Sequence, residues 1–272
     1  MESTQRPETT PQKPVPPERY DESYFLTACE GYAEFSAEEG RQLSRRLAAA
    51  FALAGVGAGM RVLDVGCGRG EVVRHCALLG ADAYGMDYAA AAVRLSRRVI
   101  TGLGAGRAEV MQGNARHLPF GSGAFDRVLM FDIVEHLHPW ELREAMREAH
   151  RVLAPDGRLI VHTAPNAWYD RYAYPVVRLL RRLQGKGEHY PPNPRAFLVP
   201  ENQYVHVNEQ SVLSLRRVLR EAGFQGRVWL DSPPQDRRDE PALERALRRL
   251  AFNAPLLRWF FERELFAVAY KA

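Results

Sequence analysis

The chain has 272 residues, of which 46% are hydrophobic and 26% are charged, and its formal net charge is +4 at pH 7. This length is sufficient for a large domain that buries its own core without help from metal ions or disulfides. So small an excess of positive charge does not indicate a dedicated nucleic-acid-binding protein. The three cysteines are odd in number and form no CxxC pair, which argues against a disulfide framework or a zinc site.

Nothing in the sequence predicts export or insertion into a membrane. The chain has no apolar run of about 18 residues, the length that a spanning helix needs. Its first residues, MESTQRPETTPQKPVPPER, lack the apolar region of a secretory signal. We therefore expect a cytoplasmic protein. Residues 1–19 are rich in proline and poor in large apolar side chains, which predicts a disordered tail.

Residues 20–59 are predicted to form an N-terminal helical lid or cap. Their first part, from Tyr20 to Phe35, is aromatic and charged, and a helix is expected over residues 38–53, where Leu43 and Leu47 have helical spacing. The aromatic side chains could close over a bound ligand or simply pack in the core. The sequence leaves both alternatives open.

From residue 60 onward, short apolar strands alternate with helices. Because parallel strands need helical crossovers, this order predicts a parallel sheet with helices on both faces. The predicted strands cover residues 61–65, 81–87, 108–113, 125–131 and 158–163. The predicted helices cover residues 71–79 and 89–103, and a third begins at Pro139. Pro155, Asp156 and Gly157 predict a turn before the fifth strand.

The C-terminal third has a different composition. Residues 167–207 are rich in proline and aromatic residues and are predicted to be an insertion. A helix follows over residues 212–222, and two final strands are expected at residues 224–230 and 265–270. Between them, residues 241–262 form a basic segment with helical character. Acidic residues interrupt the overlapping basic stretch from Arg237 to Arg249, which is interpreted as a solvated helix face rather than an RNA-binding surface.

The strongest motif is VLDVGCGRG at residues 62–70, in which a strand leads through glycines into a helix. Position 71 is Glu, so the spacing does not match the GxGxxG of dinucleotide-binding proteins. Asp64 would repel a pyrophosphate but would favour a cationic ligand. Asp87 ends the second strand, where a carboxylate can accept hydrogen bonds from both hydroxyls of a ribose. These features indicate a phosphate-free nucleoside with a zwitterionic tail; the alternative is a Rossmann-like domain whose glycines serve only a tight turn.

Five segments resemble the class I S-adenosylmethionine-dependent methyltransferases, in particular the small-molecule branch that includes the ubiquinone-type O-methyltransferases. They are VLDVGCGRG (62–70), YGMDYA (84–89), QGNARHLPF (112–120), FDRVLMFDIVEHL (125–137) and RVLAPDGRLIVHTAPN (151–166). The resemblance covers roughly residues 60–230. It implies a doubly wound, mostly parallel seven-stranded α/β sheet with an antiparallel last strand, within a methyltransferase domain over residues 60–272.

The resemblance also implies the cofactor, S-adenosyl-L-methionine, and the residues that bind it. Gly66, Cys67, Gly68 and Gly70 would pass along its methionine part, and Asp64 would lie near its ammonium group. Asp87 would bind the ribose, while Tyr88, Asn114 and Ala115 would contact the adenine. Phe131 and Asp132 would close over the ligand at the end of strand four. Most members of the family have Asp where this chain has Asn114.

A base would help an oxygen or nitrogen nucleophile lose its proton during methyl transfer. His136 is the first candidate for this catalytic role, and the alternative is a histidine that orders the loop or caps the next helix. Glu135 could orient it or be solvated. His162 is expected to be buried and hydrogen-bonded, and His189 and His206 are weaker candidates. No metal cluster and no Ser-His-Asp arrangement is suggested.

Within the insertion, residues 168–183 pair aromatic side chains with a basic amphipathic run, PVVRLLRRL, which could lie in a membrane interface. The alternative is a lid whose leucines pack on the domain. We predict a methyltransferase acting at oxygen on a small or lipid-like acceptor, without a nucleic-acid partner. The rivals are methylation at carbon or nitrogen, RNA methylation, disfavoured because no NPPY-like loop occurs, and a non-catalytic cofactor-binding subunit.

Overall fold

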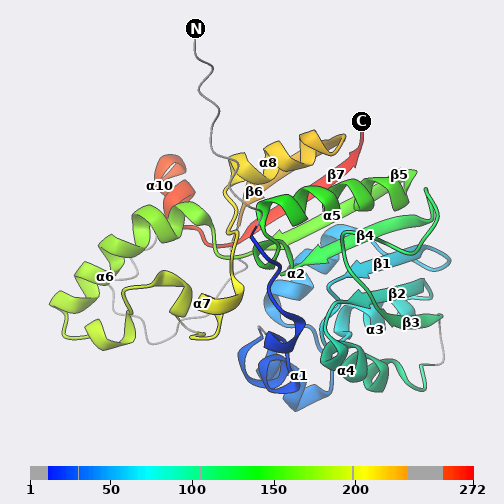
Figure 1. The fold of residues 1–272 in the computed structure, drawn as a ribbon, viewed down its shortest axis with the longest axis horizontal. Helices are drawn as coiled ribbons and strands as arrows, with labels where there is room; N and C mark the ends of the chain where they lie inside the picture. The colour runs from blue at the N-terminus through cyan, green and yellow to red at the C-terminus, as the bar shows by residue number, and fades with distance from the viewer. Residues whose placement is uncertain (1–11, 30, 104–105, 198, 232–253) are drawn as a thin grey trace, which may run out of the picture.

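The computed structural model describes residues 12–29, 31–103, 106–197, 199–231 and 254–272. These residues fold around a seven-stranded sheet with the order β3-β2-β1-β4-β5-β7-β6 (Figure 1). Strand β7 runs antiparallel to both of its neighbours, β5 and β6, and the other neighbouring pairs are parallel, as predicted. The strands are β1 (Arg61–Val65), β2 (Asp82–Asp87), β3 (Ala108–Gln112), β4 (Phe125–Phe131), β5 (Leu153–Thr163), β6 (Phe224–Leu230) and β7 (Leu265–Lys271).

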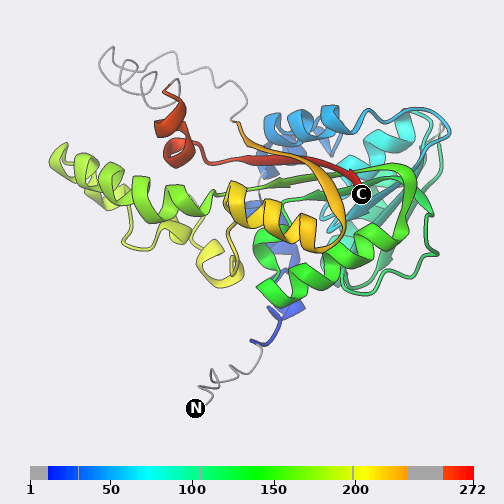
Figure 2. The ribbon, with the colours of Figure 1, turned by 90° about the horizontal axis from the view of Figure 1, so that it is seen from above.

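Helices cover both faces of the sheet, with a hydrophobic core on each side (Figure 2). Helices α5 (Pro139–Val152) and α8 (Val212–Glu221) pack on one face. Helices α2 (Arg45–Ala54) and α3 (Glu71–Leu78) pack on the other, and α4 (Ala90–Ile100) lies beside α3. Strand β4 in the centre of the sheet has Val128, Leu129 and Met130 fully buried, as expected for a strand covered on both faces.

The helix expected over residues 38–53 begins too early, because residues 39–44 are not helical and α2 begins at Arg45. Helix α1 (Tyr32–Glu38) ends where Glu39 and Gly40 take left-handed conformations, with φ of 50° and 74°. A new helix then starts at Ser44, whose hydroxyl accepts a hydrogen bond from the Leu47 N–H at 3.3 Å. Leu47 lies within α2 but Leu43 precedes it, so the helical spacing of these leucines did not locate the start of the helix.

Two other predicted boundaries also need correction. Residues 12–19 are not a disordered tail: Val15 is buried and Pro17–Arg19 forms the short helix η1. Residues 1–11 of that predicted tail lie outside the described residues. Strand β5 already begins at Leu153, so the predicted turn at residues 155–157 lies within it, where the register against β4 shifts.

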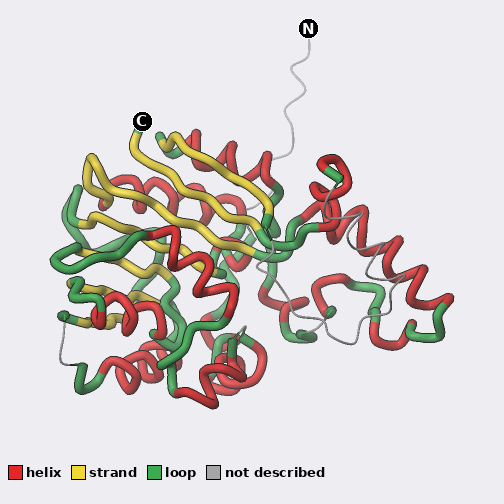
Figure 3. Tube along the Cα trace, turned by 180° about the vertical axis from the view of Figure 1, so that it is seen from behind, coloured by secondary structure: helices red, strands yellow, loops and turns green. Residues whose placement is uncertain are grey.

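The insertion leaves the sheet after β5 and forms an arm beside the domain (Figure 3). Its helical segments are η4 (Tyr169–Ala173), α6 (Tyr174–Leu183), η5 (Gly187–His189), η6 (Pro194–Ala196) and α7 (Asn202–Val205). Helix α10 (Pro255–Phe261) contacts η4 from the C-terminal side. Most of the predicted segment 241–262 lies in residues 232–253, outside the described residues. Among the described helices, none is long and apolar enough to cross a membrane.

Candidate active site

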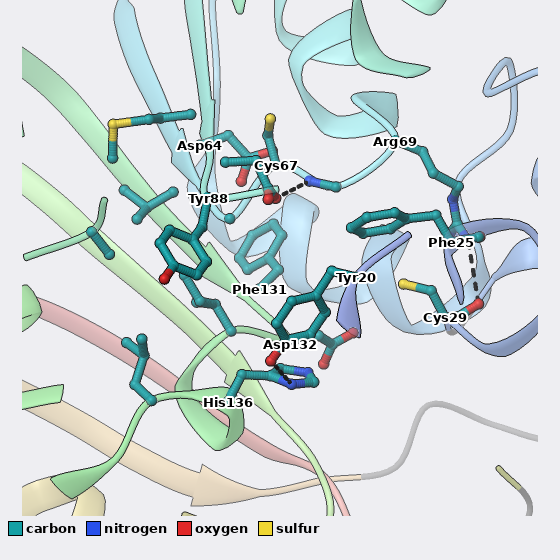
Figure 4. A pocket seen from close by; sticks show the side chains of 18 of the residues that line it. Tyr20, Phe25, Cys29, Asp64, Cys67, Arg69, Tyr88, Phe131, Asp132 and His136 are labelled. Atoms are coloured by element: carbon teal, nitrogen blue, oxygen red, sulfur yellow. Dashed lines mark hydrogen bonds between the residues drawn. The ribbon is translucent and has the colours of Figure 1, made fainter. Parts of the chain in front are cut away.

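A cavity lies at the carboxyl ends of β1, β2, β3 and β4, where the loops that follow these strands converge (Figure 4). The segment around η2 (Tyr24–Ala28) covers it from the N-terminal side. All but one of the predicted site residues line this cavity: Asp64, Gly66, Cys67, Gly68, Asp87, Tyr88, Asn114, Ala115, Phe131, Asp132 and His136. The topology of the sheet therefore brings together residues from four separate motifs.

The glycine loop bends sharply beneath the cavity. Gly66 has a φ of 77°, and a Cβ atom placed there would lie 2.7 Å from Cδ1 of Ile133, so no larger residue fits. Gly70 is the predicted site residue that does not appear in the cavity lining. It precedes α3 with a φ of 86°, and a Cβ atom on it would meet Ser96 Cβ at 2.8 Å. Because Gly70 has no side chain, helix α3 can lie close to α4.

Two carboxyl groups line the cavity next to this loop: Asp64, which is buried, and Asp87, which is partly buried. Burial, reinforced by the charges of Asp87 and Glu71, raises the pKa of Asp64 to about 8. The Asp87 carboxylate accepts hydrogen bonds from the Gly68 N–H at 2.9 Å and the Ala89 N–H at 2.9 Å. Burial still raises the pKa of Asp87 above its usual range, although these N–H groups oppose the shift. A cation bound here would relieve the cost of ionising both groups.

The adenine end differs from expectation at Asn114. Its side-chain oxygen accepts hydrogen bonds from the Arg116 backbone N–H at 3.0 Å and from the Arg116 Nε–H at 3.2 Å. The oxygen expected to meet the adenine amine is therefore already engaged within the loop. Tyr88 is 38% exposed at the cavity, which leaves its ring surface available to a ligand (Figure 4).

Sequence reasoning missed Arg69, which joins the glycine loop to the N-terminal segment. Its guanidinium forms an ion pair with Glu71 at 2.8 Å and donates to the carbonyls of Phe25 and Cys29 at 2.9 and 3.2 Å. Arg69 is only 3% exposed. These contacts hold the segment that contributes further lining residues, namely Pro14, Val15, Tyr20, Tyr24, Phe25 and Cys29. The aromatic composition of this segment was the only signal for them.

His136 lies at the end of the cavity opposite the glycine loop, on the short helix η3 (Val134–His136). Its Nδ1 is 3.2 Å from the Tyr20 hydroxyl and 3.2 Å from the Val205 carbonyl oxygen. Burial lowers the pKa of His136 to about 4, although Asp132 and the Val205 carbonyl oppose the shift. The imidazole is therefore neutral at pH 7 and free to accept a proton at its other ring nitrogen when Nδ1 donates to Val205.

Asp132 lines the cavity, but its carboxylate is bound by the protein. It lies 3.1 Å from the Arg46 guanidinium and 2.7 Å from Nδ1 of His162, which is fully buried as predicted. Burial would raise the pKa of Asp132, but the Arg46 guanidinium and the hydrogen-bonded His162 together hold it well below its usual range. Its backbone has a φ of 52°, rare for a residue other than glycine. Asp132 thus fixes the turn that carries Ile133 and His136.

Two further groups, Glu135 and His206, lie next to His136. The Glu135 carboxylate accepts a hydrogen bond from the Thr163 hydroxyl at 2.8 Å, rather than orienting the histidine as suggested. The His206 ring, from the insertion, packs edge-on against the His136 ring with centroids 4.8 Å apart. His189, the other candidate from the insertion, lies in η5 with its side chain 72% exposed.

A sheet with this strand order, a glycine-rich turn after β1 and an acidic residue after β2 defines a Rossmann-like nucleoside-binding protein. A family model described as "Methyltransferase domain" matches residues 63–161. The ubiquinone/menaquinone biosynthesis C-methyltransferase UbiE of Pseudomonas savastanoi is 30% identical over 64% of this chain and 69% of its own. The chain belongs to the class I S-adenosylmethionine-dependent methyltransferases.

Other relatives agree with this family while differing in reaction. The ubiquinone biosynthesis O-methyltransferase of Azorhizobium caulinodans is 34% identical over 44% of this chain and 46% of its own. The solved structure of a geranyl diphosphate methyltransferase with S-adenosylmethionine shares the fold, with a TM-score of 0.60 and 19% identity over 90% of this chain and 92% of that one. The chain spans about half the length of the first curated relatives that it matches.

Proposed function

We propose that this protein transfers a methyl group from S-adenosylmethionine to an oxygen atom of a small or lipid-like acceptor. The observation that carries the proposal is the shared cavity: Asp64 and Cys67 of the glycine loop lie at one end, His136 lies at the other, and Tyr20 lies between them (Figure 4). A methyl donor and its acceptor must meet in line at about 3 Å, away from water. One cavity with two chemically different ends can bring donor and acceptor together.

The residues present fit the cofactor. S-adenosylmethionine supplies an electrophilic methyl group on a positively charged sulfur. Asp64 is a buried carboxyl group and Asp87 is a partly buried one, and a cation favours the ionised form of both. The Gly68 N–H donates a hydrogen bond to Asp87, so the backbone of the glycine loop lies close to this carboxylate. Among the described lining residues, Arg69 is the only lysine or arginine, and Glu71 pairs with it. This charge balance suits a cationic donor and a neutral acceptor.

Binding and turnover test the proposal separately. Calorimetric titration should show S-adenosylmethionine binding and no comparable binding of a nicotinamide dinucleotide. Turnover is measured as homocysteine release over a panel of phenols, quinols, sugars and fatty acids. Cofactor binding without turnover on any acceptor would favour the non-catalytic subunit, whereas binding of the dinucleotide alone would refute the assignment.

Oxygen is preferred to carbon as the acceptor atom because the acceptor end presents a single neutral imidazole. The curated relatives include both an O-methyltransferase and C-methyltransferases, so they support either atom. A carbon acceptor would need strong acidification before transfer, and a phenol or quinol hydroxyl needs less. We propose that His136 accepts the hydroxyl proton as the methyl group moves, while Tyr20 and Asp132 hold the imidazole and its turn.

Replacing His136 with alanine is expected to lower kcat by about 100-fold, the lower range for loss of a general base. The affinity for S-adenosylmethionine should change little, because His136 lies at the opposite end of the cavity from the glycine loop. Steady-state kinetics and calorimetry measure the two quantities. His189→Ala, at an exposed histidine, is the control and should leave both unchanged. Unaltered kcat in His136→Ala would remove the assignment.

The affinity for S-adenosylmethionine should rise with pH between about 6 and 8. In the free protein Asp64 is protonated below its pKa of about 8, and a cationic ligand favours the ionised form. Binding should therefore strengthen by up to about tenfold per pH unit below 8 and level off above it. Calorimetry at several pH values measures the slope. Asp64→Asn should flatten it, and a slope that persists in this variant would assign it to another group.

The same pKa shift has a defined sign for stability. The folded pKa of Asp64 lies above the ordinary value of 3.8, so the folded protein keeps a proton that the unfolded chain has lost. This group therefore makes the unliganded protein progressively less stable as the pH rises from about 4 to about 8, and adds no further change above that range. Bound S-adenosylmethionine should reduce this loss.

We also propose that residues 168–183 touch a membrane surface, so that the protein works in the cytoplasm at the face of a bilayer. The predicted alternative was a lid with its leucines packed on the domain, but Leu179 is 59% exposed and Leu183 is 78% exposed. On α10, Leu256 is 81% exposed and Trp259 is 37% exposed. Apolar side chains beside Arg178, Arg181 and Arg182 match the composition of interfacial helices.

Flotation with liposomes containing anionic lipid tests this contact. The protein should float with them, and the double change Leu179→Gln and Leu183→Gln should abolish flotation. Leu213→Gln is the matched control, because Leu213 is 47% exposed on α8, away from the arm. If the unaltered protein stays at the bottom of the gradient with anionic liposomes, the membrane proposal fails.

A further inference from the structure

A cluster of two histidines and a glutamate lies behind the acceptor end of the cavity. Glu135, His136 and His206 each offer one ligand atom, and these atoms lie within 4.8 Å of one another. Glu135 and His206 are buried, and His136 also lines the cavity. Two imidazoles and one carboxylate form the donor set found in catalytic zinc sites that keep a coordination position open.

An unpartnered atom indicates that this cluster is built to take a ligand. His206 is 7% exposed, and its Nδ1 is buried without a hydrogen-bond partner among the described residues. A buried ring nitrogen left in this state costs free energy that a bound ion would recover. No other buried nitrogen or oxygen of this cluster lacks a hydrogen-bond partner, since His136 Nδ1 and a carboxylate oxygen of Glu135 both have partners.

Hydrogen bonds from neighbouring groups hold the three side chains in place, as hydrogen bonds to the ligands do in metal sites. The Thr163 hydroxyl donates to the Glu135 carboxylate at 2.8 Å, and Nδ1 of His136 lies 3.2 Å from the Val205 carbonyl, which leaves its other nitrogen free. The N–H groups of Val207 and Asn208 donate to the Glu135 carbonyl at 2.9 and 3.1 Å. Backbone hydrogen bonds therefore fasten the segment that carries His206 to the loop that carries Glu135.

We propose that Glu135, His136 and His206 bind a divalent transition-metal ion of the zinc type. Ligand bonds of about 2.0–2.2 Å require ligand atoms about 3.5 Å apart, so the three groups need to close by about 1 Å. The binding itself rests on this geometry. Its part in methyl transfer rests on the proposed function: an acceptor hydroxyl in the open position would pass its proton to water, and its oxygen would bond to the methyl carbon as the carbon–sulfur bond breaks. His136 would then act as a ligand instead of a base.

Cobalt(II) is the probe, because its visible absorption reports the number and geometry of its ligands. The full chain, freed of metal with EDTA, should bind one equivalent of Co²⁺ with a spectrum typical of four or five ligands, and Zn²⁺ should displace it. His206→Gln and Glu135→Gln should each weaken binding by at least about 100-fold, the upper end of what losing an outer contact costs. Thr163→Val removes only the hydrogen bond that the Thr163 hydroxyl donates to Glu135, and it should weaken Co²⁺ binding by about tenfold.

His189→Gln is the matched control and should bind Co²⁺ as the unaltered chain does. Calorimetry with S-adenosylmethionine on the metal-free variants checks that the fold and the cofactor site remain intact. The proposal is overturned if the unaltered chain binds no Co²⁺ at submillimolar concentrations, or if His206→Gln binds it equally well. A chain that binds the cofactor but no Co²⁺ refutes the metal site alone, and one that binds Co²⁺ but no cofactor refutes the proposed function alone.

Discussion

Replacing Gly66 with alanine is expected to destabilise the folded protein by about 3 kcal/mol. The left-handed φ of 77° costs a residue with a side chain about 1 kcal/mol, and the new Cβ would stand 2.7 Å from Ile133 in a packed site. At about 2–4 °C per kcal/mol, the midpoint of thermal unfolding should fall by about 6–12 °C. Thermal and urea unfolding measure this loss.

Gly59 provides a matched control for the Gly66 change. Its φ of 76° is nearly the same, but a Cβ atom there would have nothing within 4 Å. Gly59→Ala should therefore cost about 1 kcal/mol, from backbone strain alone. The difference between the two variants isolates the contact with Ile133. Equal losses would show that the turn tolerates the side chain and that only its backbone conformation matters.

Replacing Asp87 with alanine is expected to weaken S-adenosylmethionine binding by at least about 100-fold. The carboxylate holds the Gly68 and Ala89 N–H groups, and each hydrogen bond to a charged group contributes about 1.5–3 kcal/mol. Losing them loosens the glycine loop at the same time as the proposed ribose contact disappears. Calorimetry measures the affinity, and about 2.7 kcal/mol corresponds to 100-fold.

Asp82, at the opposite end of β2, is the control for Asp87. Asp82→Ala removes the same charge from the same strand but lies outside the cavity lining, so the affinity should stay within about threefold. An Asp87→Ala protein that unfolds at lower temperature yet binds the cofactor normally would limit Asp87 to a structural role. Asp87→Asn would then separate the loss of charge from the loss of the hydrogen bonds.

The sheet could be predicted because each strand can be recognised from its own residues. RVLDV at residues 61–65 and FDRVLMF at residues 125–131 are apolar runs bounded by polar residues or glycine, and both strands have the predicted bounds. The cofactor end of the cavity was predicted for a related reason. Parallel strands end at one edge, so residues after β1, β2 and β3 had to meet there.

The acceptor end could not be predicted because its contacts join segments that are distant in the sequence. The Tyr20 hydroxyl reaches His136 across 116 positions, and the Val205 carbonyl reaches it across 69. Neither distance leaves a pattern in composition or periodicity. The late start of α2 was missed for the opposite reason: it depends on two left-handed residues, Glu39 and Gly40, and on the cap at Ser44, which the spacing of Leu43 and Leu47 does not reveal.

The contacts of Arg69 have a consequence for the timing of turnover. Arg69 joins the glycine loop to the N-terminal segment that covers the cavity. The Tyr20 hydroxyl joins the same segment to His136. Under the proposed function, the spent nucleoside and the methylated product would leave past this segment, and these bonds would have to open for their release. We therefore expect a rapid first turnover followed by a slower steady rate, governed by the release of the two molecules rather than by the chemical step.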